Sequence, residues 1–333
     1  MKLLKFPVLI LEQILKSMNY PQLFFLSFCS NKTRRLITFF KYNLIGFSFC
    51  FGQYSLRVFF QDKNRQHCLV CKILSFRAGA VSSEILEHVD EKTTPACLMR
   101  FYRKSEDSDA LLDIQKHIFE TFSVSRKLYF TAIIDDINYY RYIPGVERFN
   151  LMEKKYEVEV VEELIRNHSE LKAVTIFNDL VGDISPDSNI FDVRNLTIQY
   201  PSRPFTEFTD HYRGRFAVFC TPNIRDARVF IDRWLRKECC DNLNNAIFFN
   251  TTGRPFDDTL LVNFGQKRID RTTMPTVPEK YPFDKDDLYY IGGGSDKLIT
   301  DGSYYAERFD GKFATIAYWD TYVVFSVWDK RPW

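Results

Sequence analysis

The sequence predicts an α+β fold in which three short N-terminal helices precede a solenoid of strand and helix units with an antiparallel β-meander at each end. Apolar residues at helical spacing predict the helices, and short strands alternating with amphipathic segments predict the solenoid. Period-two alternation between turn residues predicts the meanders. Because 333 residues exceed the usual size of one domain, we expect two regions, residues 1–42 and 43–333.

Composition places the chain among ordinary globular proteins, with 45% hydrophobic and 26% charged residues. The net charge of +2 gives no overall field that would draw the chain to nucleic acid or to a membrane. The first residues superficially resemble a signal peptide, but Lys5 and Glu12 interrupt the apolar run and no small-residue cleavage site follows. We therefore expect an intracellular protein, in the cytoplasm and/or nucleus, whose eight cysteines are reduced thiols.

Residues 6–40 are expected to hold the three helices. In the first, Pro7 suits an early helical position, and an apolar set recurs at helical spacing until Asn19-Tyr20-Pro21 interrupts it. The members of that set are Ile10, Leu11, Ile14, Leu15 and Met18. The second helix is predicted to start at Pro21 and has apolar residues on every side of its axis, namely Leu23, Phe24, Phe25, Leu26 and Phe28.

The third helix is expected to follow Ser30, whose side chain can cap its first turn. Its basic residues are predicted to face water and its apolar residues to face inward, the former being Lys32, Arg34 and Arg35 and the latter Leu36, Ile37 and Phe39. So short a segment cannot bury its own apolar surface, and it therefore needs a partner surface. That surface belongs either to another protein or to the rest of this chain.

Residues 42–74 alternate between apolar and polar positions, which predicts a meander of three strands with breaks at Gly52-Gln53 and Asp62-Lys63-Asn64. The alternating apolar positions are Phe47, Phe49 and Phe51, then Leu56, Val58 and Phe60, then Leu69, Cys71 and Ile73. Residues 76–109 have no clear pattern, and the polar stretch at 104–109 is predicted to be a loop.

The middle of the chain repeats a strand and helix pattern. Short apolar strands are predicted at residues 128–130, 149–151, 174–176, 196–198 and 247–249. Amphipathic helices are predicted between several of them, at residues 111–122, 156–167 and 225–236. This pattern resembles a degenerate leucine-rich repeat, in which neighbouring units bury one another's apolar faces.

The segment 285–330 is expected to close the fold as a second meander. Strands are predicted at residues 304–309, 313–318 and 322–328, with Asp310-Gly311 as a hairpin turn. The run Gly292-Gly293-Gly294 lacks the Gly-x-x-x-x-Gly-Lys-Ser/Thr pattern that cradles phosphates, so we interpret it as a flexible turn.

Cysteine spacing gives little support for a metal site. His67, Cys68 and Cys71 form a Cys-x-x-Cys pair, but no second Cys/His pair follows at ligand spacing. Cys71 alternates with apolar residues, which favours a packed strand. The adjacent Cys239 and Cys240 close a predicted helix, and we interpret them as structural or semi-exposed thiols.

Catalytic motifs are also missing from the sequence, and the five histidines lie in unrelated contexts. The acidic pairs Asp135-Asp136 and Asp286-Asp287 are predicted to be solvated surface. Tyr139-Tyr140-Arg141-Tyr142 has the residue types that stack on nucleobases, but acidic neighbours such as Glu147 oppose nucleic-acid binding. We expect no catalytic residue, no cofactor, no metal, and neither nucleic acid nor membrane as a partner.

The segment from Phe6-Pro7-Val8-Leu9 to Leu36-Ile37 resembles the F-box motif. The matching elements between these ends are Ile14-Leu15, Leu23-Phe24-Phe25-Leu26-Ser27, Cys29-Ser30-Asn31-Lys32 and Arg35-Leu36-Ile37. Two positions depart from the motif: Phe6 replaces the usual Leu, and Thr33 stands where many members have Trp.

The remainder resembles the type 2 F-box-associated region of a large nematode-expanded group. Phe230-Ile231-Asp232-Arg233-Trp234-Leu235 is similar to the characteristic helix of that region, and residues 190–255 match it best. Its closing segment is similar to Gly293-Gly294-Ser295-Asp296 followed by Asp310-Gly311-Lys312-Phe313-Ala314-Thr315-Ile316 and Val327-Trp328.

The resemblance implies a non-enzymatic substrate-recognition subunit of an SCF-type (Skp-cullin-F-box) E3 ubiquitin ligase. Such a protein bridges a Skp-type adaptor, and through it a cullin, to a target protein that the sequence does not identify. The implied adaptor-binding residues are Phe6, Pro7, Ile10, Leu11, Ile14, Leu15, Met18, Leu23, Leu26 and Leu36. The alternatives are an adaptor-independent protein-interaction scaffold with a degenerate F-box and, with the least support, an enzyme.

Overall fold

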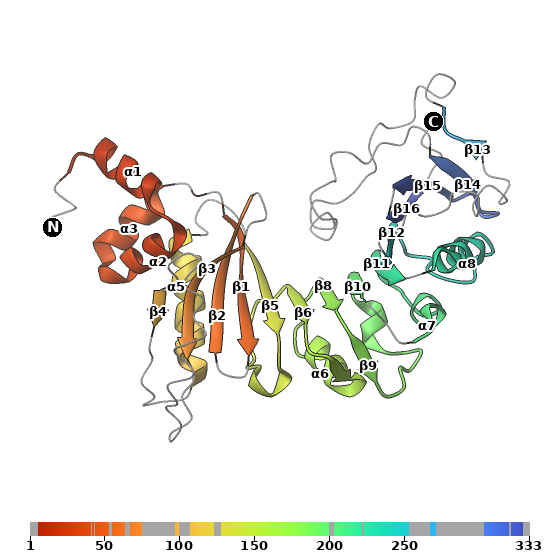
Figure 1. Cartoon of the computed structure of the whole chain (residues 1–333), viewed down its shortest axis with the longest axis horizontal. Coiled ribbons are helices and arrows are strands. Elements are labelled where there is room, and N and C mark those ends of the chain that lie inside the picture. Colours follow the sequence, from red (N-terminus) through yellow and green to blue (C-terminus); the bar gives the residue numbers. More distant parts are fainter. Residues whose placement is uncertain are drawn as a thin grey trace. The chain divides into compact units, whose positions relative to one another are not determined.

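The computed structural model describes residues 6–40, 42, 44–52, 55–63, 67–74, 97–99, 107–122, 128–199, 203–221, 223–252, 267–270, 303–319 and 321–328. The chain divides into two compact units, Met1–Met152 and Glu153–Trp333, which we describe separately (Figure 1). The predicted domain boundary at residue 42 lies inside the first unit and stays a prediction.

The first unit combines helices with a mixed sheet. Its helices are α1 (Val8–Ser17), α2 (Tyr20–Cys29), α3 (Asn31–Phe39), α5 (Asp107–Phe122) and the 3-10 helix η2 (Ile137–Tyr139). Its strands are β1 (Leu44–Gly52), β2 (Ser55–Asp62), β3 (His67–Leu74), β4 (Cys97–Met99), β5 (Tyr129–Ile134) and β6 (Arg148–Leu151). The three N-terminal helices are therefore confirmed.

The strands of the first unit lie in the order β6-β5-β1-β2-β3-β4. Strand β2 pairs antiparallel with β1 and with β3, which confirms the first meander. The pairs β1-β5, β5-β6 and β3-β4 are parallel. The meander is therefore hydrogen-bonded directly to parallel strands that lie far from it in the sequence.

Aromatic side chains join the N-terminal helices to the rest of the first unit. Phe24 of α2 is fully buried and lies edge-on to Phe60 of β2, with ring centroids 5.9 Å apart. Phe60 contacts Phe122 of α5 at 4.9 Å, and Phe47 of β1 contacts Phe119 of α5 at 5.2 Å. Such pairs contribute about 0.5–1.5 kcal/mol each beyond the burial of their area. The N-terminal helices thus share one core with the sheet and α5.

The second unit contains a parallel set of strands that continues into an antiparallel one. Its strands are β7 (Lys155–Glu157), β8 (Ala173–Ile176), β9 (Asp179–Val181), β10 (Asn195–Ile198), β11 (Phe216–Thr221), β12 (Asn245–Asn250), β13 (Lys267–Arg268), β14 (Tyr304–Glu307), β15 (Phe313–Trp319) and β16 (Tyr322–Trp328). Its helices are α6 (Val158–Arg166), the 3-10 helix η3 (Asn189–Asp192), α7 (Phe205–Thr209) and α8 (Ile224–Leu235).

Within this unit the strand order is β13-β14-β15-β16-β12-β11-β10-β8, and β7 pairs with β9 separately. The neighbours from β8 to β12 are parallel, whereas those from β12 to β13 are antiparallel. The hairpin between β14 and β15 is confirmed, and Gly311 in its turn has a φ of +86°. Residues 271–302, which include the Gly292–Gly294 run and Asp286-Asp287, lie outside the described residues.

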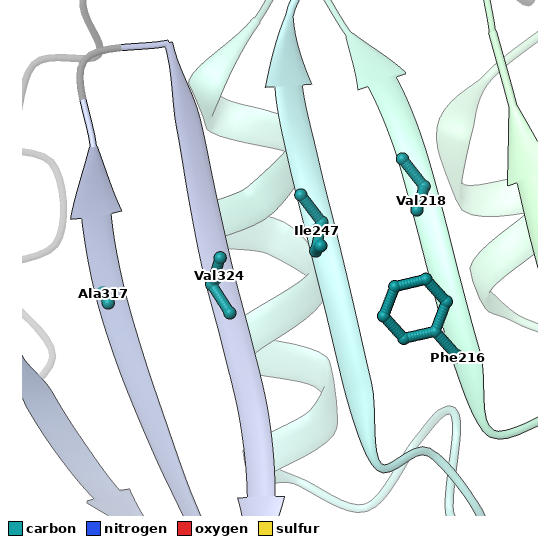
Figure 2. Close-up of a cluster of buried hydrophobic side chains, with 5 residues drawn as sticks. All are labelled: Phe216, Val218, Ile247, Ala317 and Val324. Carbon is teal, nitrogen blue, oxygen red and sulfur yellow. The ribbon is translucent and has the colours of Figure 1, made fainter. Parts of the chain in front are cut away.

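Helix α8 covers one face of the second unit's sheet. Phe230 contacts Phe248 at 5.2 Å and Phe325 at 5.3 Å, and Trp234 contacts Phe325 at 5.1 Å. Since side chains alternate along a strand, the neighbouring positions belong to the other face. Figure 2 shows the apolar cluster on that face, made of Phe216, Val218, Ile247, Ala317 and Val324.

Several sequence expectations need correction. The described residues form three helices followed by a mixed α/β region on a mixed sheet, and they show no solenoid. Helix α5 begins at Asp107, so part of the predicted 104–109 loop is helical, because acidic residues are favoured in the first turn of a helix. Strand β11 was not predicted, since its unbroken apolar run lacks period-two alternation. No helix in the described part of the chain is long and apolar enough to cross a membrane.

Candidate functional site

The turns between the N-terminal helices are fixed by side-chain caps. The Asn19 side chain accepts a hydrogen bond from the Gln22 amide at 2.9 Å, and the Gln22 side chain accepts one from the Asn19 amide at 3.0 Å. This capping box starts α2. Ser30 accepts a hydrogen bond from the Thr33 amide at 3.1 Å and starts α3, as predicted. Two short turns therefore hold the three helices close together.

The inner side of these helices is attached to α5. Arg34 of α3 forms an ion pair with Glu120 at 3.0 Å. Ser27 of α2 is hydrogen-bonded to His117 at 2.6 Å, and the Phe28 ring stacks on the His117 imidazole with centroids 3.8 Å apart. Burial, assisted by the nearby Arg34 cation, lowers the pKa of His117 to about 4. The imidazole is therefore neutral at pH 7 and suits this buried contact.

The first turn of α1 and the residue Phe6 before it expose apolar side chains to water. Val8 and Leu9 are 60% and 74% exposed, and Phe6 and Ile10 are also exposed. Together these four residues form what we call the outer surface of α1. Adjacent apolar side chains of this kind mark a binding surface more often than an isolated one does.

A further exposed side chain corrects a prediction. Phe39 was expected to face inward, but it is 76% exposed at the end of α3. Thr33 and Ile37 are buried one turn apart, and Phe39 follows Ile37 by two residues. At 3.6 residues per turn, two residues rotate a side chain to the opposite side of the helix.

The ten predicted adaptor-binding residues fall into three groups by exposure. The exposed ones are Phe6, Pro7 and Ile10, the half-buried ones are Ile14, Met18, Leu26 and Leu36, and the buried ones are Leu11, Leu15 and Leu23. All ten lie within the three N-terminal helices or directly next to them, and the first two groups are in contact with water.

Sequence reasoning missed the two most exposed apolar residues of α1, Val8 and Leu9. A signal for them exists in the run from Phe6 to Leu11, which contains no polar residue. A helical turn that is apolar all round cannot direct every side chain to one core, so part of it must face outward.

Comparison with known families identifies this segment. The F-box domain model matches residues 3–44, which span α1, α2 and α3. The N-terminal segment of this chain is an F-box domain. Thr33, at the position where many F-boxes have Trp, is buried in it and donates a hydrogen bond to the Ser30 carbonyl oxygen at 2.8 Å. The region that follows the F-box is not identified, and no curated protein and no solved structure matches the chain.

Outside the F-box, the other sequence candidates have structural partners. Cys71 is fully buried in β3, and the described residues contain no group of metal-ligating side chains. Asp135 is an ion-pair partner of Arg57 rather than solvated surface, because Arg57 reaches it from β2, on the other side of β1. Tyr140 lies edge-on to Phe51 at 5.1 Å and is not displayed as a stacking platform.

Proposed function

We propose that this chain is the substrate-recognition subunit of an SCF-type E3 ubiquitin ligase. In this proposal the F-box binds a Skp-type adaptor and, through it, a cullin, while the region after residue 42 holds a target protein. That region is proposed to be an F-box-associated, repeat-like domain. The chain supplies no nucleophile. It acts by proximity, raising the effective concentration of the target's lysines near a ubiquitin-loaded enzyme.

The observation that supports this proposal best is the outer surface of α1 within the matched F-box. Four apolar residues face water there, although a monomeric protein gains nothing from exposing them. Burying an apolar side chain of this size contributes about 1.5–3 kcal/mol when it starts fully exposed. A partner that covers this surface and the adjoining half-buried residues therefore has enough apolar area for a lasting complex, even after the entropic cost of association.

The test is binding of a purified Skp-type adaptor to the full-length chain. We expect Leu9→Asp with Ile10→Asp to abolish adaptor recovery, because two carboxylates cannot be buried unpaired against an apolar partner. The control is Val229→Asp, which places a single carboxylate at an exposed apolar position of α8 in the second unit. Equal recovery of the wild type and the double variant would contradict the proposal.

Surface variants are better suited to this test than a deletion of the F-box. Because Phe24 packs on Phe60 and Arg34 pairs with Glu120, removing residues 3–44 would uncover the core of the first unit. Leu15→Asp is equally unsuitable, because it would place a carboxylate at a buried position and disturb the fold. In cells, mass spectrometry after affinity purification should show that the Leu9→Asp, Ile10→Asp variant loses adaptor and cullin and retains the target.

The contacts of α2 and α3 with their own chain favour a second candidate, an adaptor-independent interaction scaffold with a degenerate F-box. Helix α2 contacts β3, and α3 contacts α5. If the helices serve only this internal role, the protein should elute from gel filtration as a monomer whose position an excess of adaptor does not change.

A further inference from the structure

The turn after α8 brings two adjacent cysteines into one buried position. Helix α8 ends at Leu235, and the chain then reverses through Lys237 and Cys240, which have φ angles of 61° and 54°. Cys239 and Cys240 are both buried, which excludes the semi-exposed interpretation. Both are free thiols. Their side chains interact with each other, so the two thiols form one compact dithiol.

This dithiol lies at the wall of a cavity of about 340 Å³. Most of the lining is polar or charged, and half of the lining residues come from two further segments of the second unit, around Pro186 and around Asp210 to Arg213. Cys239 and Cys240 contribute to the lining themselves. The cavity therefore gives a small polar molecule, such as water or a peroxide, a route to these two residues.

The surroundings of the two sulfurs make them chemically unequal. The Cys240 thiol donates a hydrogen bond to the Thr209 carbonyl oxygen at 3.1 Å and also interacts with the Cys239 sulfur. The Cys240 thiol and then the Arg233 cation lower the pKa of Cys239, whereas the same contact and burial raise the pKa of Cys240. Arg233 is held in place by Asp210 and by Glu238, the latter at 3.5 Å. These contacts favour ionisation of Cys239 over ionisation of Cys240.

We propose that Cys239 and Cys240 form an oxidative modification site, in which a hydroperoxide reacts at Cys239 and Cys240 then closes a disulfide. The Cys239 thiolate attacks the terminal oxygen of the peroxide, the O–O bond breaks, and the released oxide takes a proton. For hydrogen peroxide the products are a sulfenic acid and water. The Cys240 sulfur then attacks the Cys239 sulfur, the S–O bond breaks, and the second water carries away the Cys240 proton. The two thiols lose two electrons and two protons, and the peroxide gains them.

A disulfide between neighbours is easily reversed. Disulfides normally join Cα atoms about 4.4–6.8 Å apart, and a pair about 3.8 Å apart is strained. Strain raises the reduction potential, so thiols of a reducing compartment restore the dithiol. This property suits a reversible modification and not a structural crosslink.

The turn that carries the dithiol also anchors the β14-β15 hairpin. Asp241 forms an ion pair with the buried Arg308 at 2.8 Å, and its carbonyl oxygen accepts a hydrogen bond from Lys312 at 2.9 Å. Lys237 lies 3.6 Å from Asp310. Closing the disulfide would move backbone that belongs to this anchor, so oxidation acts on the hairpin as well as on the cavity.

The test uses the full-length protein treated with hydrogen peroxide, alkylated and cleaved by trypsin. The peptide Glu238–Lys267, which spans Arg254 because Pro255 blocks cleavage there, contains Cys239 and Cys240 and no other cysteine. We expect this peptide to become two hydrogen atoms lighter and to lose both alkylatable thiols, and to recover them with glutathione. The exposed single thiol Cys29 is the control and should stay alkylatable at the same peroxide dose. Oxidation of Cys29 before the pair, or retention of both thiols in the peptide, would overturn the proposal.

A variant and a second reagent make the result independent of folding effects. In Cys240→Ser the reaction should stop at the sulfenic acid, which dimedone traps on Cys239. On the wild type, phenylarsine oxide should bind once to Glu238–Lys267, because its arsenic forms two As–S bonds and releases its oxygen as water with both thiol protons. If the reduced wild type binds the arsenical at other cysteines and not at this peptide, the pair is not an accessible dithiol and the proposal fails.

Discussion

Shortening a single exposed side chain of α1 tests whether the F-box uses the outer surface of α1. Leu9 is 74% exposed, so Leu9→Ala removes few contacts within the chain and should change the free energy of unfolding by less than about 0.5 kcal/mol. In a complex the same change removes the branched end of a newly buried side chain. Full burial of Leu contributes about 1.5–3 kcal/mol, and most of that remains available to a partner.

The expected loss of adaptor binding is therefore about 1–2 kcal/mol. Since about 1.4 kcal/mol corresponds to a tenfold change, the Kd should rise by about 5- to 30-fold. Isothermal titration calorimetry with a purified Skp-type adaptor measures this directly, and Val229→Ala serves as a control at a similarly apolar, exposed position. An unchanged Kd for Leu9→Ala, with wild-type binding intact, would show that the adaptor does not cover this surface.

Three further changes probe the fold around the F-box and the C-terminal hairpin. Leu15→Ala should lower the free energy of unfolding by about 2–5 kcal/mol in urea titrations, because Leu15 is only 1% exposed; a loss below that of Leu9→Ala would contradict its burial. The pKa of His117 is lowered to about 4 in the folded protein, against about 6.5 in the unfolded chain. Because the unfolded chain therefore binds a proton first, the free energy of unfolding should fall as the pH drops from about 6.5 toward 4, by up to about 1.4 kcal/mol per pH unit. His117→Gln should remove this part of the pH dependence, and identical profiles of the two proteins between pH 7 and 4 would refute the assignment. Gly311→Ala should lower the free energy of unfolding by about 1 kcal/mol, because alanine disfavours the φ of +86° at this position. The added methyl group meets no atom within 4 Å, so no clash contributes, and an unchanged thermal midpoint would contradict this reasoning.

The local elements of this protein follow from short-range chemistry, which is why they could be predicted. Asn19-Tyr20-Pro21 and Ser30 separate the N-terminal helices by capping, and Asp310-Gly311 turns one strand back on another. Each of these signals acts within a few residues of the chain. The choice of partners for the strands does not, because nothing near Phe47 in the sequence indicates that β1 pairs with β5 in parallel. The described residues show no solenoid, and the sequence could not reveal this, because a strand and helix period does not indicate whether the meanders lie at the ends of a solenoid or pair with its strands in one sheet.

The outer surface of α1 could also be predicted only in part from the sequence. The F-box pattern marks which residues are apolar, but only the three-dimensional contacts divide them into Leu15, which is buried, and Leu9, which faces water. Likewise the adjacency of Cys239 and Cys240 is visible in the sequence, whereas half of the residues that line the cavity beside them come from distant segments, around Pro186 and around Asp210 to Arg213.

The way in which the F-box is attached bears on its proposed role. A receptor that works by proximity must hold its target at a restricted distance from the ubiquitin-loaded enzyme, because a long flexible linker lowers the effective concentration. In this chain α3 ends at Phe39 and β1 begins at Leu44, and Phe24 and His117 join the F-box helices to β2 and α5. The F-box is therefore part of the core of the first unit, and any target bound to that unit would be held at a fixed position relative to the adaptor. Loosening this attachment, for example with His117→Ala, should leave adaptor binding intact while reducing ubiquitin transfer to such a target.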